Sequence, residues 1–212
     1  MQGNKPSQSP SKPRLIVGIS GASGVIYGAR LLELLLPLPV ETHLVMSRSA
    51  EVTLALETEI KPADLRARAD VAHAIGDLAA AISSGSFPTL GMIIAPCSIR
   101  SMAEIATGVT TTLLTRAADV VLKERRRLVL LVRETPLHTG HLRTMTALSE
   151  MGAVIAPPVP AFYAKPRTID DIIDQTLGRV LDLFGLDSGT VRRWGEPPEP
   201  GRRRLRSKPS AD

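Results

Sequence analysis

Short apolar runs rich in Val, Ile and Leu alternate along this chain with longer stretches of helical periodicity, which leaves few folds open to it. The runs expected to form strands are 14–19, 42–46, 91–95, 127–132 and 153–156. The stretches expected to form helices are 24–36, 48–58, 72–83, 99–106, 110–124, 138–151 and 169–184. Runs this apolar are typical of strands covered on both faces, so the pattern predicts a parallel sheet wrapped by helices. The predicted fold is α/β, a Rossmann-like (flavodoxin-like) doubly wound parallel sheet in a single domain.

The two ends of the 212-residue chain differ in composition from the part between them. Residues 1–13 are rich in Pro, Ser, Lys and Gln, and residues 195–212 are rich in Pro and Arg. Neither end has enough apolar surface to fold by itself. We therefore predict a disordered basic tail at 1–13, a folded domain at 14–194 and a disordered Pro/Arg-rich tail at 195–212.

The net charge of +5 would ordinarily raise the possibility of a nucleic-acid partner. The excess positive charge, however, belongs to the two ends, because residues 15–194 carry equal numbers of basic and acidic residues. Three Phe, two Tyr and one Trp also provide few surfaces on which bases could stack. We therefore expect no nucleic-acid partner.

The single cysteine, Cys97, excludes an internal disulfide framework, and its position after an apolar run is typical of a buried side chain. The four histidines are scattered and give no zinc-ligand spacing, so we expect no metal site. The chain shows neither a signal-peptide stretch nor an uninterrupted apolar run of membrane-spanning length. We expect a cytoplasmic protein with no membrane partner.

Small polar residues follow four of the predicted strands directly. They form the segments Ser20–Gly24, Ser47–Ser49, Pro96–Ser101 and Arg133–Pro136. In an open α/β sheet the ligand lies beyond the carboxyl ends of the strands, so these segments should meet at one edge. Hydroxyl groups, arginines and the free N–H groups of helix starts together indicate a phosphate site.

The first two segments favour one kind of phosphate ligand over another. The spacing of Gly18, Gly21 and Gly24 matches neither the dinucleotide fingerprint nor a P-loop, and tight packing explains it equally well. Dinucleotide-binding enzymes place an acidic residue at the end of the second strand, where this chain has Ser47 and Arg48. The pattern favours a phosphate-bearing mononucleotide over NAD.

Two sets of charged residues have alternative interpretations. Arg116, Asp119 and Lys123 share one face of a predicted helix, a spacing typical of a solvated stripe of ion pairs. Arg133 and Glu134 end a very apolar strand, where an unpaired carboxylate would be costly. They form either a structural ion pair or a site in which the carboxylic acid donates a proton to a departing phosphate.

From about residue 14 to 195 the chain resembles the UbiX-type flavin prenyltransferases. The strings that carry the resemblance are Gly18–Gly24 (GISGASG), Pro96–Ser98 (PCS), Arg116–Arg125 (RAADVVLKER), Arg133–Leu137 (RETPL), Pro160–Tyr163 (PAFY) and Arg193–Gly195 (RWG). The resemblance implies an enzyme that joins the dimethylallyl group of dimethylallyl monophosphate to N5 and C6 of reduced FMN, without a metal. The product would be prenylated FMN, the cofactor of a UbiD-type decarboxylase.

The resemblance also implies roles for individual residues. The FMN contacts would be Gly21, Ala22, Ser23, Ser47, Ser98, Ile99, Arg100, Ser101 and Arg133. The prenyl phosphate would meet Tyr163 and Arg179, helped by Lys123 and Arg116. Glu134 would be the acid near the leaving phosphate, Ser23 the active-site serine and Glu57 a further acid. A dodecamer with active sites at subunit junctions is implied too, with Trp194 and Tyr163 acting across an interface.

Two other functions remain as alternatives. The first is an FMN-dependent decarboxylase of a peptidyl or pantothenoyl cysteine, but those enzymes use an Asn-containing motif and the only Asn here is Asn4. The second is an FMN-binding accessory subunit of an aromatic-acid decarboxylase. That subunit would bind FMN without turnover.

Overall fold

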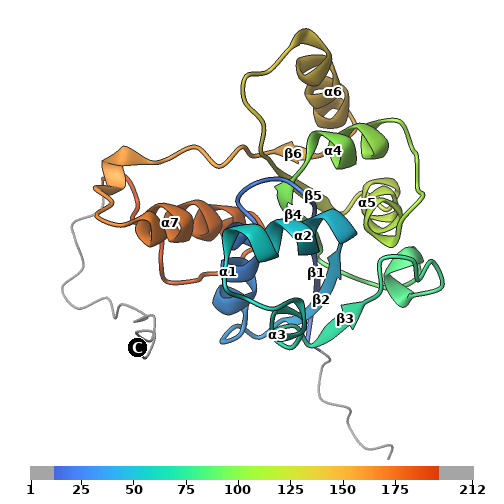
Figure 1. Ribbon diagram of the computed structural model, residues 1–212, viewed down its shortest axis with the longest axis horizontal. Helices are drawn as coiled ribbons and strands as arrows, with labels where there is room; N and C mark the ends of the chain where they lie inside the picture. Colours follow the sequence, from blue (N-terminus) through green and yellow to red (C-terminus); the bar gives the residue numbers. More distant parts are fainter. Residues whose placement is uncertain (1–11, 196–212) are drawn as a thin grey trace, which may run out of the picture.

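The computed structural model describes residues 12–195, which form one six-stranded parallel sheet (Figure 1). The strands are β1 (Arg14–Ile19), β2 (Glu41–Met46), β3 (Val71–His73), β4 (Gly91–Cys97), β5 (Arg127–Val132) and β6 (Val154–Ile155). Their order is β3-β2-β1-β4-β5-β6, which is the Rossmann order. The predicted doubly wound α/β sheet is confirmed, and its switch point lies between β1 and β4.

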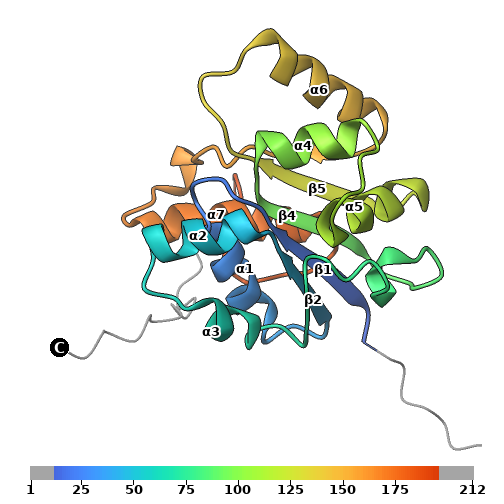
Figure 2. The same ribbon diagram turned by 45° about the vertical axis from the view of Figure 1, so that its right-hand side comes forward.

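Helices cover both faces of the sheet (Figure 2). They are α1 (Ile26–Leu35), α2 (Arg48–Glu57), α3 (Pro62–Arg66), α4 (Ile99–Ala106), α5 (Leu113–Lys123), α6 (Thr139–Glu150) and α7 (Ile169–Asp182), with short 3-10 turns η1 (Ala81–Ser83) and η2 (Phe162–Ala164). Strand β1 shows how the two cores form, because Leu15, Val17 and Ile19 pack with α1 and α7 while Ile16 packs with α4 and α5. Side chains that alternate along a strand therefore serve both cores.

Helix α1 lies unusually close to the sheet at the switch point. A Cβ added to Gly28 would stand 2.4 Å from the carbonyl oxygen of Ala95 and 2.6 Å from Cδ1 of Ile19. Only a residue without a side chain permits this approach. The start of α1 is thereby placed beside the loops that follow β1 and β4.

The helix predicted at 72–83 is wrong. Val71–His73 instead forms the edge strand β3, which pairs with β2 and places His73 Nε2 3.0 Å from Nδ1 of His43. After the strand, the carboxylate of Asp77 accepts the N–H of Ala79 at 3.2 Å, which makes a turn. Helix α3, which begins at Pro62, is also absent from the prediction.

Most of the two predicted tails lies outside the described residues. Only residues 12 and 13 of the first tail and residue 195 of the second are described, and Asn4 is not. Within 12–195, no helix is both long enough and apolar enough to cross a membrane.

Candidate functional site

Three hollows lie along the loops at the carboxyl ends of the strands. The helix-start pocket, about 480 Å³, lies among the first residues of α2, α4 and α5. The β5-loop pocket, about 420 Å³, lies between the turn at Ser23 and Gly24 and the loop that follows β5. The α7 pocket, about 260 Å³, lies between α7 and the loop that follows β6. The last two pockets share Pro157 and Val159 and are therefore neighbours.

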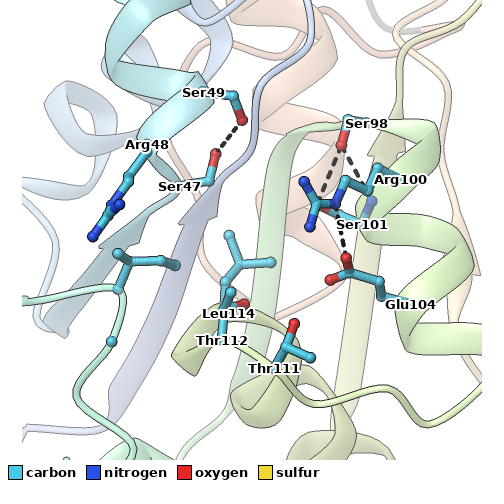
Figure 3. A pocket seen from close by; sticks show the side chains of 12 residues that line it. Ser47, Arg48, Ser49, Ser98, Arg100, Ser101, Glu104, Thr111, Thr112 and Leu114 are labelled. Carbon is cyan, nitrogen blue, oxygen red and sulfur yellow. Dashed lines mark hydrogen bonds and ion pairs between the residues drawn. The ribbon is translucent and has the colours of Figure 1, made fainter.

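The helix-start pocket brings three helix N-termini together (Figure 3). Ser47 Oγ accepts the N–H of Ala50 at 3.1 Å and caps α2, and Ser98 Oγ accepts the N–H of Ser101 at 3.2 Å and caps α4. Thr112 caps α5 through a capping box. Free N–H groups and partial positive charge at three helix starts make this pocket suitable for a phosphate group.

Two arginines and further hydroxyl groups complete the helix-start pocket. Arg48 and Ser49 lie beside Ser47, and Figure 3 shows Arg100 across the pocket from them. The Arg100 side chain is 84% exposed and pairs with Glu104 at 2.8 Å, so its guanidinium lies at the rim. A phosphate in this pocket would find cations at the rim and backbone N–H groups inside.

Buried Ser20 joins the loops that follow β1 and β4. Its hydroxyl donates to the carbonyl oxygen of Pro96 at 3.0 Å and accepts the N–H of Ser98 at 2.7 Å. The loops that follow β1 and β2 also pack against each other, because a Cβ on Gly21 would stand 2.3 Å from Oγ of Ser49. The three loops that line the helix-start pocket are thus fixed against one another.

Glu57 holds the turn at the β5-loop pocket. Its carboxylate accepts the N–H of Gly24 at 2.8 Å, the N–H of Val25 at 3.2 Å and the hydroxyl of Ser23. Burial raises the pKa of Glu57, but these hydrogen bonds and the charge of Arg133 outweigh burial and hold the pKa below its ordinary value. Glu57 is therefore a charged acceptor rather than a proton donor at neutral pH.

Glu134 has different surroundings at the same pocket. Its side chain is exposed, and Oε1 accepts the N–H of Thr135 at 3.1 Å. In the described part of the chain no ion pair joins Arg133 to Glu134, so the geometry does not support a structural ion pair. Tyr27 lines the pocket opposite this loop, and burial raises the pKa of its hydroxyl, which stays protonated.

The α7 pocket includes one residue predicted to meet a prenyl phosphate, and a second contacts its lining. Arg179 lines it and pairs with Asp182 at 2.6 Å. The hydroxyl of Tyr163 accepts a hydrogen bond at 3.2 Å from Gln175, which also lines the pocket. The ring of Trp194 meets the ring of Tyr163 edge to face, with centroids 5.5 Å apart.

Arg116 and Lys123 lie elsewhere in the chain. Arg116 donates to the carbonyl oxygen of Ser83 at 3.2 Å and pairs with Asp119 at 2.8 Å. Lys123 pairs with Glu124 rather than with Asp119. Neither side chain lines any of the three pockets, so one chain does not bring them to the other predicted residues.

The remaining predicted residues fall into groups around these pockets. Ser47, Ser98, Arg100 and Ser101 line the helix-start pocket, and Ser23, Arg133 and Glu134 line the β5-loop pocket. Gly21 and Ala22 belong to the turn between the two pockets, and Ile99 is the first residue of α4. In residues 12–195 no group of three or more His, Cys, Asp or Glu could hold a metal ion.

Thr112, Tyr27, Glu104 and Gln175 are among the polar lining residues that were not predicted from the sequence. The sequence does contain a signal for Thr112, because Thr115 three residues later completes a capping box. The predicted helix began at residue 110, however, so Thr112 was placed inside the helix and not at its N-cap. Gln175 had no local signal, since its partners lie 12 and 17 residues away.

Comparison with known proteins places the chain in a family. The Flavoprotein family model matches residues 4–181. The flavin prenyltransferase UbiX of Escherichia coli strain K12 is 63% identical over 184 residues, which cover 85% of this chain and 97% of that protein. The chain belongs to the UbiX-type flavin prenyltransferases. The predicted family is therefore confirmed.

Solved structures of UbiX proteins agree with this assignment. The AnUbiX (PadA1) structure in complex with FMN and dimethylallyl pyrophosphate is 52% identical, with a TM-score of 0.86 over 87% of this chain and 98% of that one. A dodecameric FMN-dependent UbiX-like decarboxylase from Escherichia coli O157:H7 is 53% identical, with a TM-score of 0.84 over 86% and 100%. The FMN-dependent cysteine decarboxylase TvaF, 18% identical with a TM-score of 0.56, shares only the fold.

Proposed function

We propose that this chain joins the dimethylallyl group of dimethylallyl monophosphate to N5 and C6 of reduced FMN, with release of phosphate. The proposal is supported mainly by the helix-start pocket, which suits a phosphate group, together with the β5-loop pocket that holds Ser23, Arg133 and Glu134. The chain is also 63% identical to a flavin prenyltransferase. Reduced FMN supplies the nucleophilic atoms. The chain itself binds and orients the two substrates, transfers a proton to the leaving phosphate and excludes water from the site.

The helix-start pocket fits the phosphate of FMN. Ser47, Ser98 and Ser101 offer hydroxyl groups at two helix starts, and the backbone there offers free N–H groups. Gly21 has no side chain, which lets the first turn pack directly against Ser49 at the start of α2. Arg133 stands at the adjoining pocket, where it would meet the flavin.

The catalytic residues we propose are Ser23, Glu57 and Glu134. Because the hydroxyl of Ser23 donates its hydrogen bond to Glu57, the lone pairs of Ser23 Oγ are free to accept a hydrogen bond or a proton from the ligand. We assign to Glu134 the protonation of the leaving phosphate, because its carboxyl group is exposed at the same pocket as Ser23 and Arg133. Glu57 acts on the reaction by fixing Ser23.

Tyr163 and Arg179 would bind the phosphate of the donor. A phenol hydroxyl and a guanidinium can both donate hydrogen bonds to phosphate oxygens. We place Arg116 and Lys123 at the same phosphate from a second copy of the chain, because their own chain keeps them away from it. The protein would then assemble as a homo-oligomer, of which the dodecamer of the Escherichia coli relative is the form we expect.

The product, prenylated FMN, would pass to a UbiD-type decarboxylase. We place this exchange in the cytoplasm. A reducing compartment keeps the flavin substrate reduced and is compatible with a free, buried Cys97.

The deciding experiment is anaerobic incubation of the purified protein with reduced FMN and dimethylallyl monophosphate, followed by the mass of the extracted flavin. A gain of one C5H8 unit, absent without protein, is the expected result. Parallel reactions with dimethylallyl diphosphate test which donor is used. FMN that is bound but unchanged in mass with both donors would favour the accessory flavin-binding subunit.

Replacing the proposed acid tests its role directly. Glu134→Gln is expected to keep FMN affinity and to slow prenyl transfer about 100-fold, because the amide keeps the size but cannot protonate phosphate. Glu150→Gln, at an exposed carboxylate on α6, is the matched control and should transfer at the wild-type rate. Wild-type transfer by Glu134→Gln would remove the acid from the mechanism.

A further inference from the structure

Gln175 is a buried polar residue on the otherwise apolar inner face of α7. It is only 3% exposed and lies between the buried side chains of Ile173 and Leu177 in sequence. Its Nε2 donates to the hydroxyl of Tyr163 at 3.2 Å and to the carbonyl oxygen of Arg192 at 3.0 Å, and its Oε1 accepts the N–H of Arg192 at 2.8 Å. Glutamine is seldom this buried, and here its amide joins two distant segments.

The second of these segments, residues 188–194, is named the C-terminal strap. It runs alongside α7, where a Cβ on Gly178 would stand 2.5 Å from Cγ2 of Val191. Thr190 Oγ1 donates to the carbonyl oxygen of Asp174 at 3.1 Å, and Arg193 pairs with Asp182 at 2.8 Å. The strap therefore follows α7 over two turns before it reaches Trp194.

The strap and the turn that carries Tyr163 also contact each other. Arg192 Nη1 donates to the carbonyl oxygen of Ala164 at 3.1 Å, and the Trp194 ring rests against the Tyr163 ring. Gln175 lies where α7, the strap and this turn meet. Removing its amide would leave the partly buried N–H of Arg192 without this partner and the phenol of Tyr163 without this donor.

We propose that Gln175 is a positioning residue for donor binding, acting through Tyr163. The Arg192 N–H can only donate, so it fixes Oε1 toward the strap and leaves Nε2 to donate to the phenol oxygen. That bond directs the Tyr163 hydroxyl proton away from Gln175, toward a phosphate. Arg179 lies one helical turn from Gln175 at the same pocket. One face of α7 therefore places Arg179 directly and Tyr163 through Gln175.

The proposal rests on the proposed function, in which Tyr163 and Arg179 meet the donor phosphate. Its first test is the steady-state kinetics of Gln175→Leu, which keeps the approximate size and loses the amide. The KM for dimethylallyl monophosphate should rise about tenfold, while kcat stays within about twofold and FMN affinity is unchanged. Gln175→Glu should act in the same direction, because a carboxylate cannot donate to the phenol.

Thr190→Val is the matched control. It removes a hydrogen bond between the strap and α7 but does not touch Tyr163. The control should lower the thermal midpoint and leave the donor KM unchanged. If Gln175→Leu behaves like Thr190→Val, the role of Gln175 is only structural and the proposal is overturned.

A double-mutant cycle separates positioning from general destabilisation. In a Tyr163→Phe background there is no hydroxyl to orient, so Gln175→Leu should add less than about a twofold further rise in donor KM. Rises that multiply in the double variant would show that the two residues act independently. That outcome would contradict the proposal.

A binding measurement distinguishes failure of this proposal from failure of the proposed function. Trp194 is the only tryptophan of the chain and touches Tyr163, so its fluorescence reports phosphate binding without turnover. Titration with inorganic phosphate should have its midpoint about tenfold higher in Gln175→Leu than in wild type. An unchanged midpoint overturns the proposal. A wild-type protein that responds to phosphate but leaves FMN unmodified overturns only the proposed function.

Discussion

Glu57 and Glu134 are two carboxylates at the same pocket with different hydrogen-bond partners. Glu57 accepts two backbone N–H groups and a hydroxyl, so its charged form is stabilised. Glu134 accepts one neighbouring N–H and is otherwise open to solvent and ligand. Both were expected from the sequence to be acids at the site. Their contacts distinguish them: Glu57 holds the turn, whereas the carboxyl group of Glu134 is free to contact a ligand.

The lowered pKa of Glu57 predicts how its contribution to stability varies with pH. Because the folded-state pKa lies below the ordinary 4.5, the contribution is complete above pH 4.5 and is lost as the pH falls through the folded-state value. Glu57→Gln should therefore cost about 0.5–1 kcal/mol at neutral pH, as for a carboxylate at a helix start.

Thermal or urea unfolding of both proteins between neutral and acid pH checks this expectation. The difference in the free energy of unfolding between wild type and Glu57→Gln should become smaller toward acid pH. Thr53→Ala, on the same helix but without a contact to the turn at Ser23, is a control whose gap should not change with pH. A gap for Glu57→Gln that stays constant would show that its carboxylate charge does not stabilise the fold.

Residues that follow strands could be predicted from the sequence because topology alone brings strand ends to one edge. Ser47, Ser98 and Arg133 belong to this class. Ser20 was foreseen in the first turn, but its bond to Pro96, 76 residues away, was not. Gln175 was missed because its purpose depends on partners that local patterns do not reveal.

At the scale of elements, the long buried strands and most long helices were predicted well, since each has a clear apolar period. The helix prediction for 72–83 was wrong because the alanines of this segment favour a helix, whereas pairing with β2 makes residues 71–73 a strand. An exposed three-residue strand has too few residues to show alternation. Tertiary pairing therefore outweighed local propensity at the edge of the sheet.

The contact of α1 with β4 predicts an unusual response to a helix-favouring substitution. Gly28→Ala should gain about 1 kcal/mol of helix propensity, yet we expect a net loss of about 1–3 kcal/mol. The added Cβ would meet backbone, the carbonyl oxygen of Ala95, which cannot move aside. Urea denaturation measures the change.

Gly76→Ala is the matched control, because a Cβ there meets nothing within 4 Å. Its stability should remain within about 0.5 kcal/mol of wild type. A Gly28→Ala protein as stable as this control would mean that α1 can shift away from β4 at no cost.

At the scale of the whole molecule, one chain separates Arg116 and Lys123 from the pockets that hold the other proposed residues. If each active site takes residues from two copies of the chain, two variants that are defective in different residues should restore activity when they assemble together. Lys123→Ala and Glu134→Gln, each impaired in prenyl transfer when assembled alone, should regain about a quarter of wild-type activity when co-assembled in equal amounts.

The co-assembled sample must be compared with the two variants assembled separately and then combined. Sedimentation should give a particle about twelve times the 22.7 kDa chain mass in every sample. Mixed particles that remain inactive would place Lys123 and Glu134 in sites made by a single copy. A monomeric wild-type protein would exclude shared sites altogether.

Residues 133–140, which include Arg133 and Glu134, are exposed along their whole length in the single chain. An allylic group losing phosphate beside this loop would be reached by bulk water, and dimethylallyl alcohol would form instead of the flavin adduct. If a second copy of the chain covers this loop, the ratio of dimethylallyl alcohol to prenylated flavin measures how much of the protein is assembled. Dilution or a destabilised interface should turn the enzyme into a slow phosphatase of its own donor before it loses FMN.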